Sequence, residues 1–197
     1  MLINQVENPF FSDAVFDKLY PIYIRRLSER HWTPLHIAFM AARFLAPGES
    51  SRVIDIGAGV GKFCIAGKYH SPGKFTGIEQ RKNFVRIGNK VIGQLGLSGV
   101  ELVCGNFTDL DITAYTGIYF FNSFHENIAI DDSLDDKIER SSELYQLYTT
   151  HLYNQLEKMP VSTRLATYWL SANEIPGCYK LRESHFDDLL KLWEKEF

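Results

Sequence analysis

The sequence has few cysteines, no long apolar run and no excess of charge of one sign, and each absence excludes a class of protein. Its three cysteines, Cys64, Cys104 and Cys178, lie far apart and form no CxxC pair. That spacing argues against a disulfide framework and against a zinc ribbon, so we expect the cysteines in the core. The six histidines form no recognisable ligand pair, and we predict no bound metal.

Membrane and secretory features are also missing. No apolar run approaches the length that spans a bilayer. Residues 1–10 contain no cationic stretch followed by an apolar core, which a signal peptide needs. We therefore expect a cytoplasmic protein with no membrane partner.

The charge balance bears on nucleic acid as a partner. Lys and Arg total 21 against 24 Asp and Glu, so the formal net charge is −3. Proteins that bind nucleic acid without regard to its sequence usually carry a strong basic excess. This balance predicts against a nucleic-acid partner, although it does not exclude a local basic patch. It does not predict the oligomeric state.

The remaining composition fits an ordinary globular core. The chain has 197 residues, of which 45% are hydrophobic and 23% are charged. Residues 1–50 are expected to form a helical cap, and residues 51–197 the main domain. Within the cap, Thr33 and Pro34 predict a helix that runs to Leu45, with the Thr33 hydroxyl as its N-cap.

From residue 51 onward, short apolar runs alternate with helical patterns. The strands are expected at 52–56, 74–79, 101–104, 118–121 and 164–170, with a terminal hairpin at 179–184 and 189–194. The helices are expected at 62–69, 83–95, 109–115 and 133–158, and the last of them can be interrupted near Arg140. Strands that alternate with helices pair in parallel and are covered on both faces. The sequence therefore predicts an α/β fold with a doubly wound, mostly parallel sheet and an antiparallel hairpin at its C-terminal end.

A glycine-rich turn follows the first of these strands, with the sequence Asp55-Ile56-Gly57-Ala58-Gly59-Val60-Gly61. Glycine lets the backbone turn tightly and approach a ligand, and the helix that follows offers free N–H groups to an anion. Two nucleotide motifs fail here. A P-loop needs glycine at Ile56 and Ser or Thr at Phe63. The dinucleotide fingerprint needs its third glycine at Lys62, one residue after Gly61.

The remaining pattern, Asp-x-Gly-x-Gly-x-Gly, resembles motif I of the class I methyltransferases that use S-adenosylmethionine (SAM). Further elements follow in that family's order, each after a predicted strand: Gly77-Ile78-Glu79, Gly105-Asn106-Phe107 and Asn122-Ser123-Phe124. The resemblance covers residues 51–197. It implies a seven-stranded Rossmann-like sheet with an N-terminal helical cap.

The resemblance also implies SAM as the cofactor and S-adenosylhomocysteine as its product. Glu79 would hold the ribose hydroxyls through two acceptor oxygens, and Asn106 and Phe107 would lie beside the adenine. The cofactor-binding residues that follow from the resemblance are Asp55, Gly57, Ala58, Gly59, Gly61, Glu79, Gln80, Asn106, Phe107 and Asn122.

The segment after the fourth strand carries the candidates for catalysis. Methyl transfer is a displacement at the sulfonium methyl group, so positioning of the nucleophile supplies much of the rate. Asn122 could orient an incoming amine, and His125 or Glu126 could accept its proton, or these two could simply begin the next helix. Asn122-Ser123-Phe124 also shows weak local similarity to the Asn-Asn-Phe pattern of Dot1-type methyltransferases.

The expected function is SAM-dependent transfer of a methyl group to an unidentified nitrogen or oxygen nucleophile, on a small molecule or a protein side chain. The alternative is a SAM-binding or partner-regulated module of the same fold without catalysis. A nicotinamide-dependent oxidoreductase is a third interpretation. It would need to tolerate the displaced glycine, and the sequence offers no catalytic Tyr-Lys arrangement.

Two other positions have competing interpretations. Trp32 could contact the cofactor or pack in the core, and the core is favoured. Arg81 opens a basic group with Lys82, Arg86 and Lys90, which we expect on the exposed face of a helix.

Overall fold

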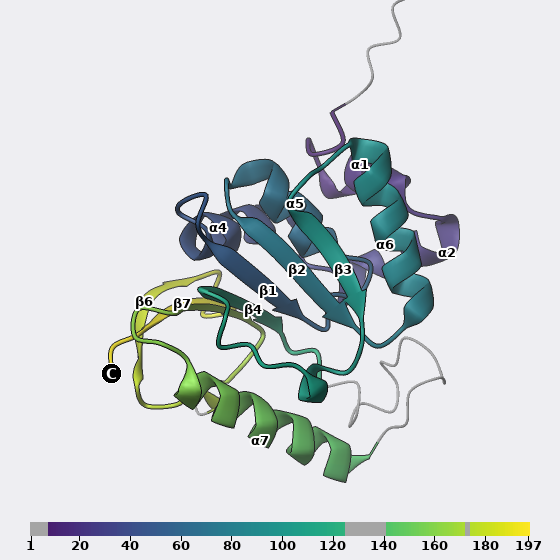
Figure 1. Ribbon diagram of the computed structural model, residues 1–197. Coiled ribbons are helices and arrows are strands. Elements are labelled where there is room, and N and C mark those ends of the chain that lie inside the picture. The colour runs from purple at the N-terminus through teal and green to yellow at the C-terminus, as the bar shows by residue number, and fades with distance from the viewer. Residues whose placement is uncertain (1–7, 125–140, 172–173) are drawn as a thin grey trace, which may run out of the picture.

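The computed structural model describes residues 8–124, 141–171 and 174–197, and its centre is a seven-stranded sheet. The strand order is β3-β2-β1-β4-β5-β7-β6 (Figure 1). The strands are β1 (Arg52–Ile56), β2 (Lys74–Glu79), β3 (Val100–Cys104), β4 (Gly117–Phe121), β5 (Arg164–Tyr168), β6 (Tyr179–His185) and β7 (Leu190–Lys195). The neighbouring strands β3, β2, β1, β4 and β5 pair in parallel, and β7 is antiparallel to both of its neighbours, β5 and β6. The predicted fold class is confirmed.

The parallel strands end together at one edge of the sheet. Ile56 at the end of β1 pairs with Ile78 of β2 on one side and with Phe120 of β4 on the other. The strand order therefore reverses at β1, where later strands begin to add on the opposite side. In open α/β sheets a ligand binds at such a switch point, beyond the carboxyl ends of the strands.

Helices cover both faces of the sheet (Figure 1). One face carries α4 (Leu35–Leu45), α5 (Lys62–His70) and α6 (Lys82–Leu95), and the other carries α7 (Ser142–Lys158). Their apolar stripes enter two core clusters, one on each face. No helix among the described residues is both long enough and apolar enough to cross a membrane.

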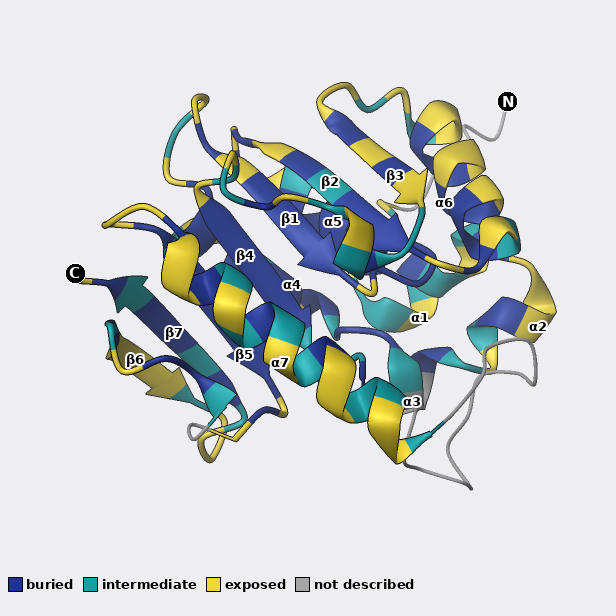
Figure 2. Cartoon of the chain, turned by 60° about the horizontal axis from the view of Figure 1, so that its bottom comes forward, coloured by how far each residue is buried: buried dark blue, intermediate teal, exposed yellow. Residues whose placement is uncertain are grey.

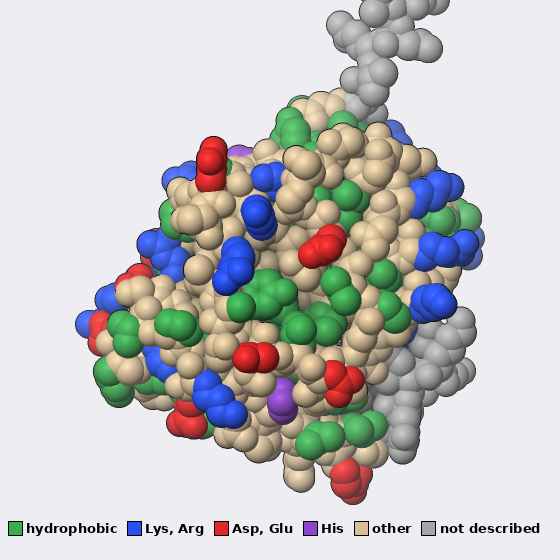
Figure 3. Space-filling view, in the orientation of Figure 1, with side chains coloured by type: hydrophobic (Ala, Val, Ile, Leu, Met, Phe, Trp, Pro, Cys, Tyr) green, Lys and Arg blue, Asp and Glu red, His purple; other side chains and the backbone are tan. Residues whose placement is uncertain are grey.

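The face of the sheet under α7 is covered unevenly. The four residues Gly117 to Phe120 of β4 are buried, whereas Glu101 and Val103 of β3 are exposed (Figure 2). Hydrophobic side chains gather on the surface between β3 and α7 (Figure 3).

Cys104 ends β3 and is exposed, so the expectation that all three cysteines lie in the core is wrong for this one.

The outer edge of β3 is closed by a side chain. Asn89 of α6 donates its Nδ2 to the carbonyl of Leu102 at 2.8 Å and accepts the Leu102 N–H at 3.0 Å through Oδ1. These two bonds occupy the main-chain groups that a neighbouring strand would otherwise pair. The sheet therefore ends here with the middle of its edge strand satisfied.

Residues before the sheet form several short helices. They are α1 (Asp13–Phe16), η1 (Asp17–Leu19), α2 (Ile22–Arg25) and α3 (Ser28–His31). The helix α4 begins at Leu35, one residue later than predicted, and Thr33 is not its cap. The Thr33 hydroxyl instead lies 2.9 Å from the Tyr119 hydroxyl, and Asp13 accepts the first α4 N–H, that of Leu35, at 3.0 Å.

One other helix prediction is wrong, and another is confirmed within the described residues. The expected helix at 109–115 is wrong, since only the 3-10 turn η2 (Phe107–Asp109) forms, with its N-terminus capped by the Asn106 side chain. The expected helix at 133–158 begins within the described residues at Ser142, where the Ser141 hydroxyl accepts the Leu144 N–H. Residues 133–140 lie outside the described part of the chain.

Candidate functional site

A hollow opens at the carboxyl edge of the sheet, beside the switch point. The space between its walls measures about 410 Å³, and this figure includes open solvent. Its walls come from the ends of β1 and β2, the loops after β3 and β4, and α7. The lining residues are Ile56, Gly57, Ile78, Glu79, Gln80, Arg81, Gly105, Phe107, Ser123, Phe124 and Tyr148.

A buried carboxylate stands at the end of β2. Glu79 is 5% exposed, and its Oε2 accepts the Gly59 N–H at 3.0 Å while its Oε1 accepts the Arg81 N–H at 2.8 Å. The Arg81 guanidinium lies 3.5 Å from the same Oε1. The expectation that Arg81 faces solvent is therefore wrong, because its side chain is buried and its guanidinium pairs with Glu79. These contacts fix the carboxylate at the rim of the hollow.

Aromatic rings form the opposite wall. Phe124, after β4, packs between Phe107 and Tyr148, with ring centroids 6.0 and 5.4 Å away. Ile78 at the end of β2 adds an apolar side chain to the same hollow. Flat apolar walls beside a fixed carboxylate suit a ligand that has a planar aromatic part and a polar part.

The amides of Asn106 and Gln80 meet at the Tyr148 hydroxyl. Asn106 donates to it at 3.1 Å and Gln80 at 3.4 Å. The Asn106 Oδ1 also accepts the Thr108 N–H. Asn106 was expected to contact the adenine directly, but it does not line the hollow, and its Nδ2 instead holds Tyr148.

The three glycines of the turn have different surroundings. Gly57, at φ +75°, borders the hollow, and a Cβ there would come within 2.4 Å of the Ser123 Cβ. Gly59 lies under the Trp32 ring, and Gly61, at φ +78°, lies against Leu102. Of the three, only Gly57 lines the hollow, while Gly59 and Gly61 permit close packing.

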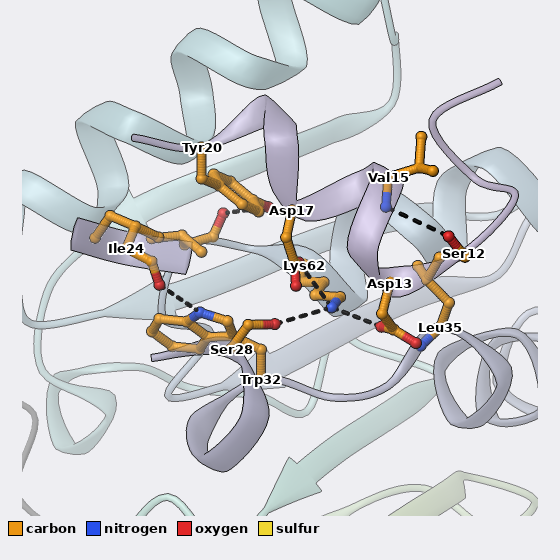
Figure 4. A network of polar contacts seen from close by, with 11 residues as sticks. Ser12, Asp13, Val15, Asp17, Tyr20, Ile24, Ser28, Trp32, Leu35 and Lys62 are labelled. Atoms are coloured by element: carbon orange, nitrogen blue, oxygen red, sulfur yellow. Dashed lines mark hydrogen bonds and ion pairs between the residues drawn. The ribbon is translucent and has the colours of Figure 1, made fainter. Parts of the chain in front are cut away.

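The turn is also tied to the N-terminal segment. Lys62, directly after Gly61, is 3% exposed, and its ammonium lies 2.6 Å from Asp13, 2.9 Å from Asp17 and 3.2 Å from the Ser28 hydroxyl (Figure 4). The Tyr20 hydroxyl donates to the Val60 carbonyl at 3.3 Å. Trp32, as favoured from the sequence, is a core residue, and its indole N–H donates to the Ile24 carbonyl.

Asp55 lies beneath the glycine turn instead of in the hollow. It is 4% exposed, and its Oδ2 accepts the Cys64 thiol hydrogen at 3.7 Å. Burial raises the pKa of this carboxyl to about 8, the Cys64 hydrogen bond opposes that rise, and the nearby charge of Glu79 adds to it. The folded protein therefore holds the proton of this carboxyl to a higher pH than an exposed aspartate would.

The loop after β4 leaves the sheet in an unusual conformation. Asn122 has φ +36°, and the Ser123 hydroxyl donates to the Ile56 carbonyl at 2.7 Å. That bond draws the loop against the end of β1. Asn122 is partly exposed beside this bond and does not line the hollow. His125 and Glu126 lie outside the described residues.

The structure brings together four of the predicted cofactor residues, namely Gly57, Glu79, Gln80 and Phe107. Six others do not line the hollow: Asp55, Ala58, Gly59, Gly61, Asn106 and Asn122. Tyr148 was missed. Its spacing with Leu152 and Leu156 marks the buried face of a helix, but nothing in the sequence places that face beside β2 and β3.

No family model matches the sequence, and no curated protein matches it. Solved structures match the fold. TrmN from Thermus thermophilus aligns with a TM-score of 0.62 at 15% identity, over 88% of this chain and 52% of its own. A putative methyltransferase from Escherichia coli, yhhF, aligns at 0.58 and 13% identity, over 82% of this chain and 84% of its own.

An RNA methyltransferase from Salinibacter ruber, solved in complex with S-adenosyl-L-homocysteine, aligns at a TM-score of 0.55 and 16% identity. The alignment covers 82% of this chain and 90% of that one. The chain spans about half the length of TrmN and most of the length of the other two. At these identities the likeness shows a shared fold.

Proposed function

Starting from the class I methyltransferase fold, which this chain has, we propose that the protein binds SAM and transfers its methyl group to a nitrogen or oxygen nucleophile. The observation that carries the proposal is the position of Glu79. Its carboxylate is fixed by two backbone N–H groups at the rim of a hollow, beside the switch point of the sheet. A carboxylate at that place suits the two hydroxyls of a ribose.

The residues of the hollow fit the other parts of this cofactor. Phe107, Phe124 and Ile78 offer apolar surface to an adenine ring. Gly105 leaves room beside them, because a Cβ there would meet only the Ile78 side chain, at 3.7 Å. The hollow continues past Gly57 to the loop after β4, which is where the methionine part of the cofactor would lie.

SAM, when bound, supplies a methyl group on a sulfonium, and this chain has to place a nucleophile in line with it. We assign the orienting role to Asn122, which follows β4 directly and precedes Ser123, a residue that lines the hollow. Where the acceptor is an amine that loses a proton, His125 is the proposed base. Positioning of the nucleophile supplies most of the acceleration in a displacement of this kind.

The acceptor is proposed to be a small molecule or a protein side chain. The net charge led us to expect no nucleic-acid acceptor. The fold likeness to an RNA methyltransferase does not support that expectation. The non-catalytic module foreseen as an alternative is not favoured by the methyltransferases of like fold.

Calorimetric titration of the purified chain with SAM, S-adenosylhomocysteine and NAD tests the proposal. We expect SAM and its product to bind and NAD not to bind. Glu79→Gln should weaken binding of the product about tenfold or more, because a charge-assisted hydrogen bond is lost. Glu101→Gln, on the exposed face of β3, is the matched control and should bind as the wild type does.

A folded wild-type chain that binds neither SAM nor its product would contradict the proposal. Binding of NAD alone would point to the nicotinamide-dependent interpretation. Thermal unfolding of each variant should accompany the titrations, since Glu79 also holds the backbone of Gly59 and Arg81.

A further inference from the structure

The Tyr148 hydroxyl belongs to a residue that lines the hollow, and it accepts hydrogen bonds from two side-chain amides. It belongs to α7, is 6% exposed and lies where the ends of β2 and β3 approach that helix. Its ring is held against Phe124. The hydroxyl is a polar group on an otherwise apolar wall, so its hydrogen-bonding capacity matters for whatever binds there.

The direction of the hydroxyl hydrogen follows from Asn106. The Thr108 N–H donates to the Asn106 Oδ1, so the other arm of that amide is the NH₂ group. This NH₂ group donates to the Tyr148 oxygen at 3.1 Å. A phenol that accepts from Asn106 cannot also donate to it, and its own hydrogen must point elsewhere.

Gln80 is the other neighbour of this hydroxyl, and it is the weaker one. Its amide lies 3.4 Å from the Tyr148 oxygen, and its side chain is exposed. Like Asn106, Gln80 donates to the phenol oxygen, so neither amide takes the hydroxyl hydrogen and a ligand acceptor can take it. Because both amides donate to the phenol oxygen, its hydrogen points away from both of them, and Tyr148 itself lines the hollow.

We infer that Tyr148 is a specificity residue that donates a hydrogen bond to a ring nitrogen of the cofactor's purine. The inference rests on the proposed function and deepens it. Adenine presents bare ring nitrogens as acceptors, and the Tyr148 hydroxyl stands beside the apolar rings of Phe107 and Phe124, which offer no donor of their own. Asn106 acts through Tyr148 as a positioning residue, in place of the direct adenine contact expected for it.

The test is a binding cycle with S-adenosylhomocysteine and its 1-deaza, 3-deaza and 7-deaza analogues, in which one ring nitrogen is replaced by C–H. Tyr148→Phe keeps the ring and removes the hydroxyl, and it should weaken binding of S-adenosylhomocysteine about three- to tenfold. One analogue should bind the wild type more weakly than S-adenosylhomocysteine does, by that same factor. The same analogue should bind Tyr148→Phe as tightly as S-adenosylhomocysteine binds it. Tyr153→Phe, on the same helix but outside the hollow, should bind as the wild type does.

The inference fails if Tyr148→Phe binds S-adenosylhomocysteine as tightly as the wild type. It also fails if every analogue loses the same factor in the wild type and in Tyr148→Phe, because no ring nitrogen then couples to the hydroxyl. If the wild type binds no S-adenosylhomocysteine at all, the proposed function itself is overturned and this inference falls with it.

Discussion

The Trp32 ring lies so close to Gly59 that a Cβ atom on Gly59 would come within 2.4 Å of the Trp32 Cζ3. The ring comes from the N-terminal segment, and the glycine belongs to the turn after β1. Gly59 also has φ +56°, a conformation that costs other residues free energy. Both the backbone conformation and the Trp32 ring therefore require glycine at this position.

Gly59→Ala should lower the free energy of unfolding by about 3 kcal/mol, through the left-handed backbone and the crowded Trp32 ring together. Gly96→Ala isolates the first cause, because Gly96 has φ +63° and open space around its Cα, and it should cost only about 1 kcal/mol. Urea unfolding measures both. Equal costs would show that the Trp32 contact contributes nothing.

Asp55→Asn should change how stability depends on pH. Folding raises the pKa of Asp55 from 3.8 to about 8, so between these values the folded chain holds a proton that the unfolded chain has released. The stability that this group contributes is complete below about pH 4 and is lost as the pH rises toward 8. The asparagine side chain does not titrate, so its contribution to the free energy of unfolding does not change with pH.

The difference in unfolding free energy, wild type minus Asp55→Asn, should fall by roughly 1.4 kcal/mol per pH unit between about pH 5 and 7. Urea titrations at pH 5, 6 and 7 measure it, and the subtraction removes the effect of other groups. Parallel profiles for the two proteins would contradict a raised pKa.

Lys62→Met should destabilise the protein by about 3 kcal/mol. It removes the cation that faces Asp13 and Asp17 and leaves Asp17, whose side chain is 14% exposed, without its partner. Lys82→Met is the control, at the exposed start of α6, and should change stability by less than about 0.5 kcal/mol. A Lys62→Met protein as stable as this control would show that the three charges contribute no net stability.

Asn89→Ala should cost about 1 to 2 kcal/mol, because the N–H and carbonyl of Leu102 both lose their partner. The same change uncovers the β3 edge, so the variant should associate at high concentration. Light scattering and urea unfolding measure the two effects. Gln94→Ala, at an exposed position of α6, should show neither.

The sequence was sufficient for the sheet and for the place of the hollow. Apolar runs and helical spacing depend on local chemistry, so the strands and the terminal hairpin were predicted within a few residues. Glu79 and Gly57 could be placed together because the carboxyl ends of parallel strands share one edge. The Dot1-type similarity and the role of His125 stay predictions.

The remaining features depend on contacts between distant segments. Thr33 has the residue type of a helix cap, but its hydroxyl pairs with Tyr119, which lies 86 positions further along the chain. Asp55 has the residue type of a ligand contact, yet it is buried under α5 beside Cys64. Tyr148 joins the hollow only because α7 crosses near β2 and β3. Residue type and spacing carry no information on such pairings.

The position of Lys62 has a consequence for how the chain unfolds. Residues 8–34 cannot leave the sheet without separating the buried Lys62 ammonium from the two carboxylates that pair with it. We therefore predict that the boundary expected at residue 50 separates stretches of sequence and does not separate cooperative units. Amide hydrogens in α1 and α5 should exchange with solvent in the same opening event, and removal of the first thirty-four residues should leave a remainder that does not hold its glycine turn.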